Sequence, residues 1–159
     1  MGEIVKQKIW TGIFIVPPVI LLIVLGPPAV LSLMVLLATF FGLREFYTLA
    51  LPHAKWIERF AGIGLGLILS AVSSNGDVKV VLPFFVLLLL LLSILFLGTS
   101  QNLFSTISNM GIMLLGILYI GFLLSHVSLI RSMVNGTQWV LFLIITVWAG
   151  DICALLGGT

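Results

Sequence analysis

A single carboxylate, Asp151, lies in a long apolar run near the end of this sequence. The run from Trp139 to Leu156 is long enough to cross a membrane, and Asp151 is its only charged residue. Placing a charged side chain there costs several kcal/mol of free energy unless a partner, a cation or water stabilises it. Asp151 is therefore either a structural carboxylate that pairs with a neighbouring span, or part of a polar pocket that handles phosphates through Mg²⁺. Since one carboxylate is not a metal site, the main metal ligands are expected beyond Thr159.

Arg44 and Tyr119 are two further candidates for contacts with a lipid or another substrate. Arg44 and Glu45 directly follow an apolar stretch. This pair either forms an ion pair where a helix enters the membrane interface, or supplies a basic group that holds a lipid phosphate at headgroup depth. Tyr119 is either a packing residue or a hydrogen-bond donor that faces the bundle. Gly116 and Gly121, on the same apolar run, are expected at packing surfaces.

The composition is that of an integral membrane protein. Hydrophobic residues make up 61% of the 159 residues, charged residues make up 8%, and the mean hydropathy is +1.34. A soluble domain carries about 25% charged residues. The formal net charge is only +2, which gives no sign of nucleic-acid binding. The single cysteine, Cys153, excludes an internal disulfide.

Six apolar runs approach the roughly 20 residues that a membrane-spanning helix needs. They cover about Ile9–Leu25, Ala29–Leu43, Ile57–Val72, Val80–Leu97, Met110–Ile130 and Trp139–Leu156. The second run is short unless Arg44 and Glu45 extend it, and the third contains the glycine-rich GIGLGL, which suits close helix packing. The sequence therefore predicts an all-α, polytopic membrane helix bundle of about six spans. It forms a single membrane domain over residues 1–159 that is incomplete at the C-terminus.

The connections between these runs differ in composition. The stretches SSNGD and VNGT, at residues 73–77 and 134–137, are typical of turns. The segment Arg44–Arg59 mixes charged and aromatic residues, which predicts a short amphipathic helix in the interface, broken near Pro52. Residues 98–109 are polar and uncharged and are predicted to form a linker.

The distribution of lysine and arginine favours a cytoplasmic N-terminus. Five of these residues fall on the N-terminal side of the membrane and two on the other: Lys6, Lys8, Arg44, Lys55 and Arg59 against Lys79 and Arg131. Lys6, Lys8, Lys55 and Arg59 are interpreted as charges that set the orientation and also attract anionic lipid. With six spans, this orientation places Asp151 in the cytoplasmic half of the membrane.

Four stretches carry a family resemblance. In order, they are VKQKIWTGI, FFGLREFYTLA, GILYIGFLLSHVSLIR and VWAGDICALLGG. Together they resemble the N-terminal part of bacterial phosphatidate cytidylyltransferase, also called CDP-diacylglycerol synthase. The matching residues are Arg44, Glu45, Phe46, Gly116, Tyr119, Ile120, Arg131, Asp151, Ala154 and Gly158. Lys8 and Leu155 depart from the family pattern, which has arginine and tyrosine at these places.

The resemblance implies a nucleotidyltransferase of phospholipid biosynthesis in the bacterial inner (cytoplasmic) membrane. It implies that CTP and phosphatidate give CDP-diacylglycerol and pyrophosphate, with Mg²⁺ offsetting charge on the triphosphate. Asp151 would then line a polar cavity open to the cytoplasm. The family's C-terminal acidic and basic signature is not in these residues, so this chain alone is expected to be inactive. Membrane lipids are expected partners, and a homodimer is compatible with this organisation.

Two other classes of function remain open on the sequence. In a small ion- or proton-coupled transporter subunit, Asp151 would act as a relay, and Pro17-Pro18 would mark a discontinuous helix. In a non-catalytic membrane scaffold, the glycine-rich spans would serve only for oligomerisation. The enzyme interpretation requires CMP transfer, the transporter interpretation requires transport that Asp151→Asn abolishes, and the scaffold predicts changes only in assembly or stability.

Overall fold

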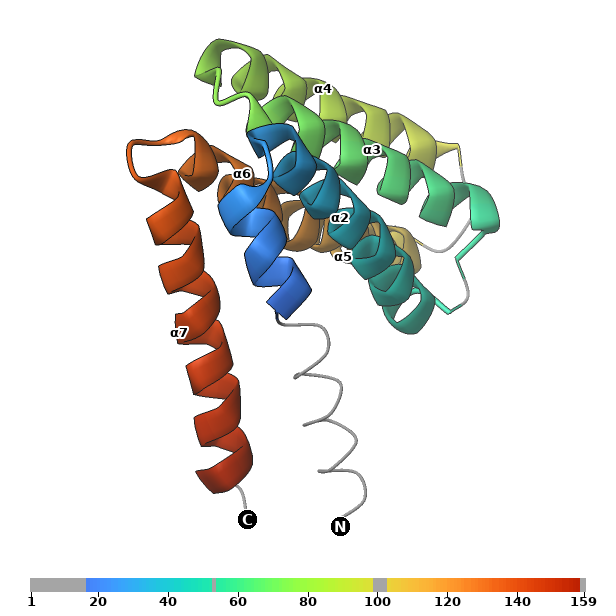
Figure 1. The fold of residues 1–159 in the computed structure, drawn as a ribbon. Helices are drawn as coiled ribbons and strands as arrows, with labels where there is room; N and C mark the ends of the chain where they lie inside the picture. Colours follow the sequence, from blue (N-terminus) through green and yellow to red (C-terminus); the bar gives the residue numbers. More distant parts are fainter. Residues whose placement is uncertain (1–16, 53, 99–102, 158–159) are drawn as a thin grey trace. The chain divides into compact units, whose positions relative to one another are not determined.

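The computed structural model describes residues 17–52, 54–98 and 103–157, and within these ranges it contains no strand. Residues 17–25 are helical, and a series of longer helices follows (Figure 1). The bounds are α2 Pro28–Ala50, α3 Trp56–Ser74, α4 Val78–Leu97, α5 Leu103–Gly116, the π-helical segment η1 Ile117–Phe122, α6 Leu123–Ser132 and α7 Gly136–Gly157. The prediction of an all-α fold is confirmed.

Within the described residues, five helices are long and apolar enough to cross a membrane. They cover Pro28–Ala50, Trp56–Ser74, Val78–Leu97, Phe104–Ser132 and Gly136–Ala154. The first four contain the second to fifth predicted spans, and α7 contains the sixth, so the prediction of a helical membrane bundle is confirmed. Most of the first predicted span, Ile9–Leu25, lies outside the described residues.

The predicted break near Pro52 is confirmed, but the prediction of a separate interfacial helix between the second and third spans is wrong. Residues 44–50 continue α2, which ends at Ala50, and α3 begins at Trp56. Pro52 explains the boundary, because the ring of a proline disfavours helical backbone in the residue before it. Arg44 and Glu45 therefore extend the second span, and the charged and aromatic residues of this segment belong to the ends of two long helices.

The predicted linker at residues 98–109 is also too long, because α5 already begins at Leu103. Serine and threonine fit inside a membrane helix when the hydroxyl bonds to a carbonyl one turn back. Ser93 and Thr146 do so, donating to the Leu89 and Phe142 carbonyls at 2.8 Å each. Polar residues without charge therefore do not end a helix here.

The two turn-type sequences do form turns. Gly76 has φ +72°, a left-handed conformation that glycine adopts without strain. Asp77 caps α4, because its carboxylate accepts a hydrogen bond from the Lys79 backbone N–H at 3.0 Å. Asn135 has φ 59°, which asparagine tolerates better than most residues.

The chain divides into two compact units, which are described separately. The central unit is Ser32–Leu129, and the terminal unit combines Met1–Leu31 with Ile130–Thr159. The core of the central unit draws residues from several helices: Leu43, Tyr47, Leu51, Ile63, Leu69, Leu88, Leu92, Phe96, Met113 and Ile117. α4 contributes three of these residues and leaves other leucines exposed, as a helix that faces lipid would.

Glycines set the closest contacts between α2 and α3. A Cβ atom on Gly62 would lie 2.9 Å from the Tyr47 ring, and one on Gly66 would overlap Leu43. As the residue number increases along α3, the number of the contacting residue on α2 decreases, so the two helices are antiparallel there. Gly64 faces open space. The two glycines four residues apart are the ones that pack, which is the spacing expected of small residues at membrane helix interfaces.

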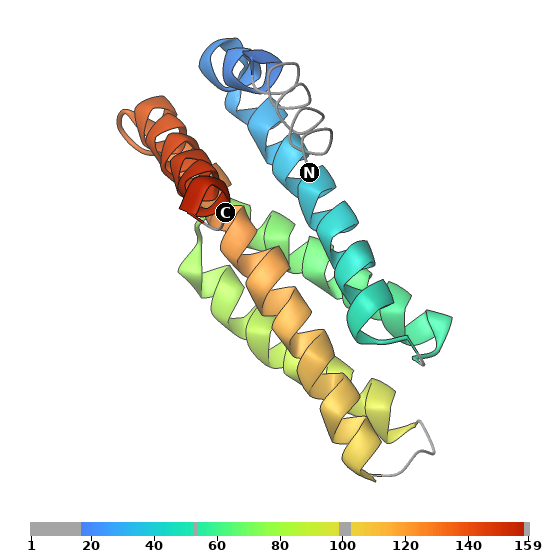
Figure 2. The same cartoon turned by 90° about the horizontal axis from the view of Figure 1, so that it is seen from below.

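A second close contact joins α3 to η1, and a third joins α2 to the end of α5. A Cβ atom on Gly121 would lie 2.8 Å from the Gly66 carbonyl oxygen, and one on Gly116 would meet the Tyr47 ring. The prediction that Gly116 and Gly121 lie at packing surfaces is confirmed. Figure 2 shows residues 103–132 as one uninterrupted helix, within which η1 is a short π-helical stretch.

The terminal unit contains the helical residues 17–25 and α7. An Arg131 guanidinium nitrogen donates to the Gly26 carbonyl at 3.3 Å, and this hydrogen bond links the two chain segments that form the unit. Ile23, Leu31 and Val140 are buried. Most other side chains of α7 that the structure describes are exposed or half-buried.

Candidate functional site

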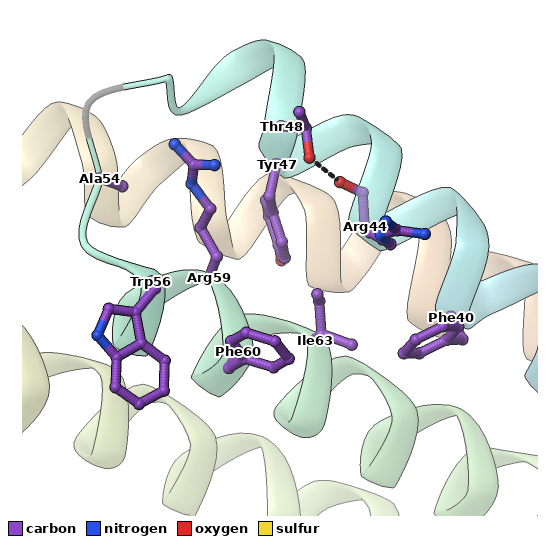
Figure 3. Close-up of a pocket in the computed structure, with 9 residues that line it drawn as sticks. All are labelled: Phe40, Arg44, Tyr47, Thr48, Ala54, Trp56, Arg59, Phe60 and Ile63. Atoms are coloured by element: carbon purple, nitrogen blue, oxygen red, sulfur yellow. Dashed lines mark hydrogen bonds between the residues drawn. The ribbon is translucent and has the colours of Figure 1, made fainter.

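A pocket of about 480 Å³ lies where α2 and α3 are joined (Figure 3). Nine residues line it: Phe40, Arg44, Tyr47, Thr48, Ala54, Trp56, Arg59, Phe60 and Ile63. The volume falls within the range of roughly 300–1,000 Å³ that is usual for ligand sites. All nine residues belong to the central unit.

Helical spacing explains why these residues share one pocket. The lining positions are 40, 44, 47 and 48 on α2, and 56, 59, 60 and 63 on α3. Residues three and four apart lie on the same face of a helix, so each set forms one face. The short connection at Pro52 turns the chain back, and the two faces meet at the end of the antiparallel pair.

Tyr47 forms a fixed part of the pocket wall. Its side chain is fully buried, and its hydroxyl donates to the Met113 carbonyl at 2.8 Å. Gly62 and Gly116 leave room for the ring on either side. Because both packing and a buried hydrogen bond hold it, Tyr47 gives the pocket a rigid surface rather than a reactive group.

Arg59 is held in place at the pocket by the helix connection. One of its terminal nitrogens donates to the Pro52 carbonyl at 2.6 Å. Its Nε is buried and has no hydrogen-bond partner among the described residues. A guanidinium carries five N–H donors, so one hydrogen bond leaves most of its capacity unused.

Arg44 lies across the pocket on α2, and its side chain is exposed. In Figure 3, Arg44 and Arg59 are seen on either side of Tyr47. The Arg44 carbonyl accepts a hydrogen bond from the Thr48 hydroxyl at 2.7 Å. The nine lining residues therefore carry two guanidinium groups and no carboxylate, which makes the pocket cationic.

Aromatic side chains form the α3 side of the pocket. Trp56 and Phe60 are 70% and 64% exposed, and their rings meet edge to face with centroids 6.0 Å apart. Tryptophan is enriched where a membrane helix meets the lipid headgroups. The pocket thus combines two cations with an exposed apolar rim at the end of two membrane-spanning helices.

Asp151 lies on α7, in the terminal unit, and is exposed. Tyr119 lies in η1 of the central unit, is 66% exposed, and is not among the lining residues of the pocket. Of the three predicted site residues, only Arg44 lines the pocket. The roles predicted for Asp151 and Tyr119 stay predictions.

The described residues hold no preformed metal site made of several protein ligands. They contain no group of three or more His, Cys, Asp or Glu side chains that could hold a metal ion. Mg²⁺ is usually bound by one or two carboxylates together with substrate phosphates and water. Asp151 is the only carboxylate predicted for this role.

The sequence interpretation missed Arg59, Trp56 and Phe60 as part of a site. A usable signal existed, because Arg59 and Arg44 both fall near Pro52, one on each side of the reversal. The prediction of a separate interfacial helix hid this relation. Once α2 and α3 are antiparallel neighbours, both arginines lie at the same end of the pair.

Comparison with known proteins identifies the family. A model of the cytidylyltransferase family matches residues 6–159, nearly the whole chain. Searches of curated proteins and of solved structures gave no match. The matched range includes Arg44, Tyr119 and Asp151. The chain therefore belongs to the cytidylyltransferase family, the family of phosphatidate cytidylyltransferase (CDP-diacylglycerol synthase), whose members are CTP-using nucleotidyltransferases.

Proposed function

We propose that this protein transfers CMP from CTP to phosphatidate, giving CDP-diacylglycerol and pyrophosphate for phospholipid synthesis in the bacterial inner membrane. The family match over residues 6–159 carries the CTP half of the proposal. The lipid half is supported by the helices themselves, since five in the described residues are long and apolar enough to span a membrane. An acceptor dissolved in the bilayer reaches such a protein by lateral diffusion.

The reaction balances without any redox partner. An oxygen of the lipid phosphate attacks the α-phosphorus of CTP and forms a new P–O bond. The bond from the α-phosphorus to the oxygen that bridges to the β-phosphorus breaks, and pyrophosphate leaves with that oxygen. Two anions must approach each other, so cationic side chains that hold the acceptor phosphate lower the cost of the encounter.

Asp151, Arg44 and Tyr119 are each proposed to contact a substrate. The exposed Asp151 would contribute a carboxylate to the polar cavity that receives CTP. The exposed Arg44 would contact the lipid phosphate, and the exposed Tyr119 would donate a hydrogen bond to a substrate. Mg²⁺ is proposed to accompany the triphosphate, with ligands outside the described residues.

The direct test is CMP transfer by the protein in native membranes. Membranes are incubated with radiolabelled CTP, Mg²⁺ and either phosphatidate or diacylglycerol, which lacks the phosphate. We expect labelled CDP-diacylglycerol with phosphatidate alone. EDTA should abolish its formation if Mg²⁺ accompanies the triphosphate. Product formed from diacylglycerol, or no lipid product at all from a folded protein, would contradict the assignment of phosphatidate as acceptor.

Asp151→Asn tests the proposed cavity role, with Asp77→Asn as its matched control. Asp77 caps α4 in a turn, and asparagine is an equally good cap, so this variant should keep its activity. We expect Asp151→Asn to lower CMP transfer by at least about a hundredfold, the range seen when a group that acts on the transition state is removed. Equal activity of the two variants would show that Asp151 does not take part.

A further inference from the structure

We propose that the pocket between α2 and α3 binds the phosphate-monoester headgroup of a membrane lipid through Arg44 and Arg59. This inference deepens the proposed function, because phosphatidate is such a lipid. It assigns a location and a residue, Arg59, that neither the family match nor the sequence provides. Binding is measured without CTP, so its failure and a failure of CMP transfer can be told apart.

The position of the pocket fits headgroup depth. It lies at the end of α2 and the start of α3, two helices long and apolar enough to span a membrane. Both arginines fall on the side with the larger number of lysines and arginines, the side expected to face the cytoplasm. A lipid phosphate therefore lies at the same depth as the two guanidinium groups.

The charges of the pocket favour a doubly charged phosphate. No carboxylate is among the lining residues. The nearby Glu58 is buried, with 3% exposed, and its carboxylate accepts from the Lys55 backbone N–H at 3.3 Å. A phosphate monoester carries about −1.5 to −2 charges at pH 7 and has three strong acceptor oxygens. Two guanidinium groups therefore suit a monoester better than the singly charged diester of most phospholipids.

The hydrogen bonds of both arginines leave donors for this phosphate. Within the part of the chain that the structure describes, the hydrogen bonds of Arg44 involve its backbone, and its guanidinium group makes none. Arg59 makes one, to the Pro52 carbonyl, and its Nε is buried without a described partner. A buried donor without a partner is costly, so a phosphate that reorients this guanidinium and accepts from it would relieve that cost.

The exposed rings identify the ligand as a lipid rather than a free anion. Trp56 and Phe60 present large apolar surfaces beside the cationic end of the pocket. Inorganic phosphate or a nucleotide triphosphate gains little from that surface. The glycerol and the first methylenes of two acyl chains can lie against it while the phosphate reaches the arginines.

Binding can be measured with the purified full chain in dodecyl maltoside, titrated with fluorescent phosphatidate. Arg44→Gln and Arg59→Gln should each weaken binding about tenfold, the loss expected when a charge-assisted hydrogen bond is removed. Lys55→Gln is the matched control, because it removes the same charge at the same end of α3 without lining the pocket. This control should change binding less than twofold.

Competition identifies the ligand chemistry. Unlabelled phosphatidate should displace the probe at concentrations at least about tenfold lower than phosphatidylglycerol, a diester, because it carries the extra charge. Millimolar inorganic phosphate should not displace it. Equal loss in Lys55→Gln, equal competition by the diester, or displacement by inorganic phosphate would each overturn the proposal.

The Arg44 variant keeps the test decisive if Arg59→Gln does not fold. Arg59 supports the connection at Pro52, whereas the exposed Arg44 side chain supports no described contact. A monodisperse Arg44→Gln protein that binds phosphatidate like the wild type would reject the site. CMP transfer to phosphatidate by that same variant at the wild-type rate would reject only the site and leave the proposed function standing.

Discussion

α3 and α7 are both apolar enough to span a membrane, yet they use their small residues differently. On α3, Gly62 and Gly66 are covered by Tyr47 and Leu43 of α2. On α7, Gly150 has no atom within 4 Å of the position that a Cβ would occupy. Glycine alone therefore does not predict a contact between helices. The contact forms where two glycines four residues apart meet large side chains on a neighbouring helix.

The contact between Gly121 and α3 should be the most sensitive to substitution. Gly121→Ala places a methyl group 2.8 Å from the Gly66 carbonyl oxygen, so one backbone must move. We expect a loss of about 2–3 kcal/mol in the free energy of unfolding, as for other overpacked sites. Reversible unfolding in mixed SDS and dodecyl maltoside micelles measures it.

Gly111→Ala is the control for this prediction. Gly111 lies on the same long helix and has no neighbouring atoms within 4 Å of a Cβ. Alanine is a better helix former than glycine, so the control should be neutral or gain up to about 1 kcal/mol. Equal destabilisation by the two variants would show that the close backbone approach at η1 does not limit stability.

Tyr47→Phe should have a smaller effect than Gly121→Ala. The variant keeps the ring between Gly62 and Gly116 but removes the hydrogen bond to the Met113 carbonyl. A loss of about 1 kcal/mol is expected in the same unfolding assay, as for a typical buried hydrogen bond. Tyr119→Phe provides the comparison, because Tyr119 is 66% exposed, and it should leave stability unchanged. A larger loss of stability in Tyr119→Phe than in Tyr47→Phe would contradict the assignment of Tyr47 as a rigid part of the pocket wall.

Gly150→Ala extends the comparison to α7. Because nothing surrounds Gly150 within the described residues, the methyl group should fit without any movement. Stability should stay the same or rise by up to about 1 kcal/mol. A loss comparable to that of Gly121→Ala would mean that α7 packs at this position in the membrane-embedded protein.

Asp151→Asn should have the smallest effect on stability. The exposed side chain has no described partner in an ion pair, so a change below about 0.5 kcal/mol is expected. The same variant is expected to lose CMP transfer, which separates function from folding at this residue. A loss of several kcal/mol would instead favour a structural carboxylate that pairs with a neighbouring span.

The spans were predictable because long apolar runs leave few alternatives in a membrane. The GIGLGL sequence predicted that glycines would form close helix contacts. It did not predict which residues of the neighbouring helices they would contact. Which of Gly62, Gly64 and Gly66 packs depends on the side chains that α2 presents opposite them. That pairing is a property of the folded unit and leaves no mark in the GIGLGL sequence itself.

The candidate site was predictable only in part. Arg44 was identified because it directly follows an apolar run, where a basic group can hold a lipid phosphate at headgroup depth. Arg59 was interpreted as a charge that sets orientation, because its proximity to Arg44 depends on the reversal at Pro52. The break near Pro52 was predicted, but both arginines were placed on a segment lying in the interface instead of at the ends of two antiparallel spans.

The π-helical stretch makes the long helix sensitive to the number of its residues. Met113, Ile117, Gly121, Ser125 and Ser128 are all buried, at intervals of mostly four residues. In a regular α-helix, four residues overshoot a full turn by about 40°, so such a row would wind away from one neighbour. A wider turn at η1 offsets this drift. Deleting one residue of 117–122 should therefore be absorbed by a return of η1 to regular α-helical turns, whereas inserting one residue there should rotate the following serines by about 100° and expose them.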